Sequence, residues 1–158
     1  MGNNNLAPIE KLELLLPGFR FYKSMDLIKQ DDAMVRYALK NNLEKIRELI
    51  ESKENDIVSR DPMDESIKDF ERVLVLLRTF IQEIFASPTG MYTYYSRYKI
   101  DENNLYDILN HDYSLISISK EILENFEKMG IVDLMIRIRN LRDLFSEREK
   151  YFIQENIR

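Results

Sequence analysis

Apolar residues recur at intervals of three and four between Asp61 and Ala86, and this pattern constrains the fold more than any other feature of the chain. Side chains at that spacing share one face of an α-helix. Asp61 and Pro62 suit a helix start, because aspartate accepts hydrogen bonds from first-turn amides and proline needs no partner there. We therefore predict a central apolar core helix near 61–86. Its apolar positions are Ile67, Phe70, Val73, Leu74, Leu77, Phe80, Ile81, Ile84 and Phe85, thickened in the middle by Val75 and Leu76.

The same spacing predicts helices on both sides of this segment. A run at Leu115–Ile118 could form a strand, but no second strand-like run is present to pair with it, so a helix start is the better interpretation. The fold class that follows is all-α: one helical bundle of about five to seven helices over 1–158, with a loose N-terminus over 1–7. The further helices are expected at 8–16, from Ser24 to about Lys53 with Arg36 and Lys40 on its solvated face, from Asp101 to Leu109 before a turn at 110–112, from Ser117 or Ser119 to Gly130, and from Val132 to near the C-terminus with a kink near Phe145.

Length and composition suit a folded protein. A chain of 158 residues can bury roughly 70% of its unfolded surface, and 44% hydrophobic with 32% charged residues is a globular composition. No apolar run approaches the ~20 residues that span a bilayer, and the first residues lack the basic and apolar parts of a secretory signal. We expect a cytoplasmic protein that does not enter a membrane.

The residue inventory removes most catalytic chemistry. The chain has one histidine, His111, and no cysteine, which excludes thiolate metal sites and cysteine nucleophiles. Asp107 could orient His111 from four residues away, but no serine elbow or glycine-rich oxyanion loop accompanies the two. Four glycines cannot build a phosphate-binding loop. We therefore expect no catalytic residue, no metal and no cofactor, and predict that the protein is not an enzyme.

Pairs of acidic residues leave one enzymatic alternative open. Glu51 with Glu54, and Glu124 with Glu127, have the spacing that all-helical magnesium-dependent nucleotide hydrolases use. Such pairs arise by chance several times in a chain with 28 acids. A carboxylate-metal hydrolase is thus the third choice.

A tyrosine-dense segment follows the helix-breaking residues 87–90, and it is the least ordinary part of the chain. Tyrosine, methionine and arginine are favoured at protein interfaces. Tyrosines can equally seal the end of a bundle, since the ring is apolar and the hydroxyl can reach water. We predict that the partner-binding residues are Tyr92, Tyr94, Tyr95, Arg97 and Tyr98.

The excess negative charge lies directly after the tyrosines. The segment from Asp101 to Gly130 contains seven acids and two lysines, so its net charge is −5, which equals the net charge of the whole chain. An aromatic anchor beside a negative rim would suit a basic partner or a second copy of the chain. We therefore expect an interaction or adaptor subunit that docks a protein through 91–99 and the acidic stretch 101–129.

Nucleic-acid binding is the main alternative, because the same tyrosines could stack on bases while nearby cations neutralise phosphates. Two i,i+4 pairs, Asp133 with Arg137 and Arg139 with Asp143, would neutralise part of that charge. The candidate nucleic-acid-binding cations are Arg97, Lys99, Arg137, Arg139 and Arg142.

Overall fold

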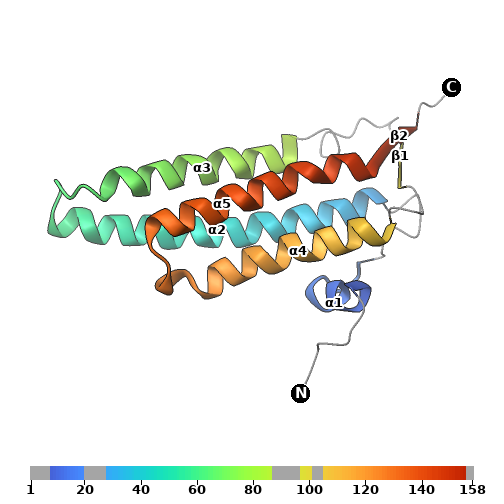
Figure 1. Cartoon of the computed structure of the whole chain (residues 1–158), viewed down its shortest axis with the longest axis horizontal. Helices are drawn as coiled ribbons and strands as arrows, with labels where there is room; N and C mark the ends of the chain where they lie inside the picture. Colours follow the sequence, from blue (N-terminus) through green and yellow to red (C-terminus); the bar gives the residue numbers. More distant parts are fainter. Residues whose placement is uncertain (1–7, 20–27, 87–96, 101–104, 156–158) are drawn as a thin grey trace, which may run out of the picture.

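The computed structural model describes residues 8–19, 28–86, 97–100 and 105–155. Its main body is a bundle of four long helices, which confirms the all-α prediction (Figure 1). Helix α2 packs on α3 and α4, and α5 packs on the same two helices, so the four form a ring in which α3 and α5 run side by side in the same direction (Figure 1). The short α1 packs against α4. The helices are α1 (Pro8–Leu15), α2 (Ile28–Arg60), α3 (Ile67–Ala86), α4 (Leu105–Glu124) and α5 (Ile131–Ser146).

The helices form because each has a stripe of apolar side chains that the others cover. α2 buries Val35, Leu39, Leu43, Ile46 and Ile50, at intervals of three and four, and none of them is exposed to solvent. α5 buries a similar stripe that ends at Phe145, whose ring meets that of Phe80 edge-on at 5.8 Å. The core lies between the four helices. The contribution of α3 is Phe70, Val73, Leu74, Leu77, Phe80 and Ile84.

α3 is the apolar core helix that the sequence predicts, but it lines the core as one of four and it begins later than predicted. Asp61 does not start a helix, because its carboxylate accepts a hydrogen bond from the Met63 amide at 3.0 Å within a turn. Asp64 makes a second such turn with Ser66 at 2.8 Å. The widened middle of the stripe is only partly covered, since 60% of Val75 is exposed while Leu76 is half-buried against the core.

α4 is continuous, so the prediction of two helices separated by a turn at 110–112 is wrong. Two residues of the expected turn, His111 and Asp112, instead lie within α4 and are buried in tertiary contacts. Ser119 does not cap a helix, because its hydroxyl donates to the Ile116 carbonyl at 2.8 Å and accepts from the Asn42 amide group at 2.9 Å. The helical interpretation of 115–118 is confirmed. A 3₁₀ turn, Phe126–Lys128, follows α4 and leads to α5.

The last helix ends at Ser146, well before the predicted end. A 3₁₀ segment, Glu147–Tyr151, follows it and leads to strand β2, Phe152–Glu155. β2 pairs antiparallel with β1, Arg97–Ile100, with Ile100 opposite Phe152. This pairing joins segments that lie far apart in the chain, and neither has the length or alternation that marks a strand from sequence.

Candidate functional site

Four charged side chains are buried together at the end of the bundle that carries β1 and β2. This ionic cluster consists of Asp32, Arg36, Asp112 and Arg148, all at most 2% exposed. The Arg148 guanidinium donates to Asp112 at 2.6 Å and to Asp32 at 2.7 Å. Arg36 donates to Asp32 at 2.9 Å and also to the backbone carbonyl of Ile84. Within the cluster two cations therefore meet two anions, and a third buried acid, Asp31, precedes Asp32 on α2.

The ionic cluster connects four elements, because its members and their acceptors come from α2, α3, α4 and the 3₁₀ segment after α5. Taking charges out of water is costly, and only good geometry and complete pairing offset the cost. The Arg36 guanidinium also lies 5.3 Å from the centre of the Phe145 ring. The prediction that Arg36 lies on a solvated face is wrong: Asp32 is only four residues away, but the Ile84 carbonyl and the Phe145 ring that Arg36 also contacts are distant in sequence. We assign the ionic cluster a structural role.

His111 lies beside this cluster and is 8% exposed. Among the described residues, neither ring nitrogen has a hydrogen-bond partner, and the ring centre lies 5.7 Å from that of Tyr151. Burial lowers its pKa below the ordinary 6.5; Asp112 opposes this shift and Arg148 adds to it. Asp107 is exposed on α4 and forms no hydrogen bond with either ring nitrogen. The geometry is that of a packed neutral histidine.

The lowered pKa of His111 makes stability depend on pH. The unfolded chain takes up a proton as pH falls through 6.5, whereas the folded protein resists protonation at this site, so falling pH favours unfolding. The contribution of neutral, buried His111 to the free energy of unfolding is complete above pH 6.5 and is lost progressively as the pH falls below 6.5. We expect the free energy of unfolding of wild type to fall more steeply between pH 7 and 5 than that of His111→Leu, measured by urea denaturation. Equal slopes would show that His111 does not titrate abnormally.

One member of each acidic pair proposed for a metal is engaged in an ion pair. Glu51 binds Arg47 at 2.9 Å and Arg78 at 3.5 Å, and Glu124 lies 3.9 Å from Lys120. In the part of the chain that the structure describes, no group of three or more histidine, aspartate and glutamate side chains could hold a metal ion. In the same part, no helix combines the length and the apolar character needed to cross a membrane.

Most of the tyrosine-rich segment lies outside the described residues, including Tyr92, Tyr94 and Tyr95. Arg97, Tyr98 and Lys99 belong to β1, whose backbone pairs with β2. Of the acidic stretch, Asp112 is buried in the ionic cluster and does not contribute to a surface. The remaining described acids on exposed positions are Asp107, Glu121, Glu124 and Glu127.

The arginines of α5 have three different surroundings. Arg137 pairs with Asp133 at 3.2 Å, as the spacing predicts. The predicted pair of Arg139 with Asp143 is not formed, and Arg139 has no ion pair with any described residue. Arg142 binds Glu83 of α3 with two hydrogen bonds, one of 2.7 Å from its Nε and a second from the adjacent amino group. This bidentate contact ties α5 to α3.

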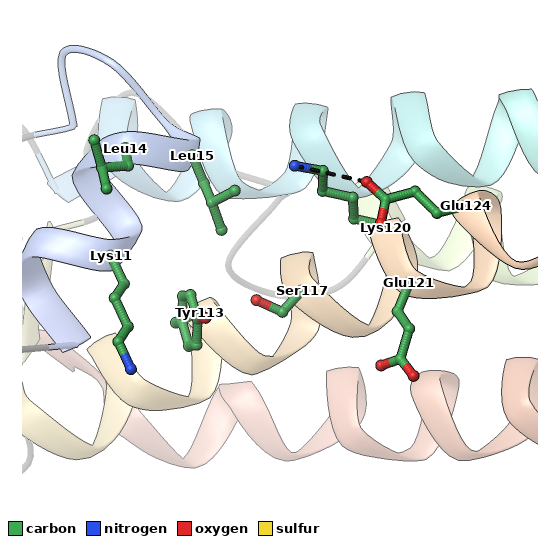
Figure 2. Close-up of a pocket in the computed structure, with 8 residues that line it drawn as sticks. All are labelled: Lys11, Leu14, Leu15, Tyr113, Ser117, Lys120, Glu121 and Glu124. Carbon is green, nitrogen blue, oxygen red and sulfur yellow. Dashed lines mark ion pairs between the residues drawn. The ribbon is translucent and has the colours of Figure 1, made fainter. Parts of the chain in front are cut away.

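One pocket lies between α1 and α4 and has a volume of 470 Å³. Figure 2 shows its two sides, with Lys11, Leu14 and Leu15 on α1 facing the residues of α4. The Lys11 ammonium lies 5.7 Å from the Tyr113 ring centre. The α4 side consists of Tyr113, Ser117, Lys120, Glu121 and Glu124. Its two lysines and two glutamates balance in charge, so it has no preference for one sign of ligand.

A second pocket, of 590 Å³, lies between α3 and α5, and we call it the α3–α5 groove. Four cations and one acid line it, so its charge is opposite to that of the whole protein, which carries −5. Its most exposed apolar residue is Val75, from α3. The lining is Lys68, Glu71, Arg72, Val75, Leu76 and Thr79 of α3, with Arg139 and Arg142 of α5.

Apolar side chains continue along α5 beside the groove. Val132 and Ile136 precede Arg139 by seven and three residues and so lie on the same face of the helix. They are 53% and 49% exposed. The groove lining therefore combines the exposed Val75 with basic side chains, including two of the predicted nucleic-acid-binding arginines. Val132 and Ile136 lie outside this lining and extend the apolar surface along the face of α5 that carries Arg139. The chain matches no known protein-family model, and no curated protein or solved structure is detectably similar to it.

Proposed function

We propose that the protein is a non-enzymatic interaction module that docks a protein partner through the α3–α5 groove. The observation that carries this proposal is the combination of exposed aliphatic side chains and a basic rim on an otherwise acidic protein. Clustered exposed apolar residues with polar surroundings are typical of interaction sites. Complementary charge then selects the partner and accelerates encounter.

A double variant, Val75→Glu with Ile136→Glu, tests the proposal. It places two carboxylates where a partner's apolar side chains would pack, while both positions are exposed in the free protein. We expect affinity capture from the source lysate, after nuclease treatment, to recover at least about tenfold less of the specific partner proteins, because burying unpaired charge in an interface costs well over 1.4 kcal/mol. Quantitative mass spectrometry gives the readout.

The matched control is Met63→Glu, in the turn between α2 and α3, where the side chain is 87% exposed and lies outside the groove lining. This variant should retain all partners, and both variants should keep the wild-type helical content and melting temperature. Equal recovery by the groove variant and wild type would remove the groove from the function.

Docking through the tyrosine-rich segment stays a prediction, and it forms part of the proposal as a second contact. The same capture experiment tests it with Tyr94→Ala combined with Tyr95→Ala. Loss of partners in this variant would assign the contact to 91–99, whereas full recovery would exclude these two rings.

A nucleic-acid-associated protein is the second candidate, because Lys68 and Arg139 have no ion pair with any described residue and could contact phosphates. Salt separates the two candidates. Binding to phosphates weakens steeply as ionic strength rises, whereas an interface built on apolar burial weakens little. Partners that disappear after nuclease treatment would favour this candidate.

A further inference from the structure

We infer that the occupant of the α3–α5 groove is an acidic amphipathic helix of about three turns, an inference that rests on the proposed function. The shape of the groove, the charges of its rim and the apolar side chains between them fit such a helix.

The shape follows from two parallel helices. α3 contributes Lys68, Arg72, Val75 and Thr79 to the groove, at intervals of four, three and four residues. These positions form one stripe that is about 16 Å long, since a helix rises about 1.5 Å per residue. Two adjacent helices leave a straight depression between their ridges, which a third helix can fill. A partner helix of about three turns matches the length of the stripe.

The charges of the rim are available to a partner. Arg139 and Lys68 have no ion pair with any described residue, and Arg72 is 69% exposed and lies 3.6 Å from Asp69. Such an exposed pair contributes little and can be replaced by a partner's carboxylate. Arg142 differs, because Glu83 already binds it. Lys68, Arg72 and Arg139 therefore select an acidic segment.

The apolar side chains favour a protein helix over nucleic acid. A phosphate backbone would leave Val75, Val132 and Ile136 without apolar contacts. An amphipathic helix places aliphatic side chains on Val75 and Ile136 and acids toward the flanking cations, which is how helix-in-groove recognition works. Its apolar anchors would recur at three and four residues.

Designed peptides test this inference on the full chain. The probe is a 16-residue helical peptide with leucines at intervals of three and four and glutamates on both flanks. Its comparisons are a scrambled peptide of the same composition, the same peptide with lysines for glutamates, and a 16-nucleotide single-stranded DNA. Binding is measured by fluorescence anisotropy, and the site is located from amide NMR shifts.

We expect the acidic amphipathic peptide to bind at least about tenfold more tightly than the scrambled one, and to shift the amides of Val75, Thr79 and Arg139. Arg72→Glu and Arg139→Glu should each weaken binding about fivefold, as expected when one charge contact becomes repulsive. Met63→Glu should leave the affinity unchanged.

Equal binding of the scrambled peptide, tighter binding of DNA, or shifts confined to the α1–α4 pocket would overturn the inference. So would self-association of the chain through the groove, detected by analytical ultracentrifugation of wild type and Val75→Glu. If no peptide binds at millimolar concentration but capture still depends on the groove, the partner is not an acidic helix and the interaction module stands. If both experiments fail, both proposals are wrong.

Discussion

Arg148→Met should lower the free energy of unfolding by about 3–5 kcal/mol, because it removes a buried cation from the carboxylates of Asp112 and Asp32, of which Asp32 keeps Arg36. Arg148 is fully buried and donates to both Asp112 and Asp32. Methionine fills much of the volume but offers no donor. Urea denaturation at pH 7 measures the loss of stability. The m-value, which is the slope of the free energy of unfolding against urea concentration, should equal that of wild type.

The matched control is Arg139→Met, on the exposed face of α5, which should change stability by no more than about 0.5 kcal/mol. A second variant, Arg148→Met with Asp112→Leu, should recover part of the loss, since it also removes the buried carboxylate that lost its two hydrogen bonds from Arg148. If Arg148→Met is as stable as Arg139→Met, the ionic cluster does not stabilise the fold.

Leu77→Asp should unfold the protein at 25 °C. Leu77 is fully buried in α3, and the substitution combines the loss of a core side chain with an unpaired buried charge, at a cost of more than about 5 kcal/mol. Native domains have only about 5–15 kcal/mol of stability in total. Circular dichroism should show loss of helical signal and no cooperative melt.

Val75→Asp provides the comparison, because it places the same residue two positions away on the exposed side of α3. This variant should melt cooperatively, close to the wild-type temperature. A cooperative, unchanged melt of Leu77→Asp would contradict the assignment of α3 to the core.

Local pattern was enough to predict the helical class and the buried stripe of α3. The stripe of Phe70, Val73 and Leu77 repeats with the period of a helix, and that period depends only on near neighbours. The start of α3 was missed because Asp61 can cap a turn as well as a helix. The apolar period and Asp61 are both local signals, but only the apolar period indicates a single structure, a helix.

Tertiary contacts explain the larger errors. Asp112 and Arg148 are 36 residues apart, and Asp32 and Arg148 are 116 apart. A polar residue that forms a buried pair over such a distance has the same local appearance as a surface residue or a turn. This is why α4 was predicted as two helices and why Arg36 was assigned to solvent.

The candidate site was predictable in part. Arg139 and Arg142 were identified from charge alone, although only Arg139 is free of ion pairs with described residues, while Arg142 binds Glu83. Lys68, Arg72 and Val75 were missed because they lie on α3 beside its buried stripe. Their spacing of four and three residues is a second helical stripe, and it was visible in the sequence.

Two contacts at the C-terminal end of α3 fix its position beside α2 and α5. Glu83 of α3 binds Arg142 of α5, and the carbonyl of Ile84 accepts a hydrogen bond from Arg36 of α2. These bonds hold the last turns of α3 at a fixed distance from its neighbours. A groove that exists before binding saves the partner the cost of ordering it.

The central claim is that a protein partner contacts the α3–α5 groove, and site-specific photo-crosslinking in living cells tests it most directly. A photoreactive amino acid would replace Val75 in one protein and Met63 in another, since both side chains are exposed and only Val75 lines the groove. We predict a discrete protein adduct from position 75 and none from position 63. Identical products from both positions, or nucleic acid as the product at position 75, would contradict the claim.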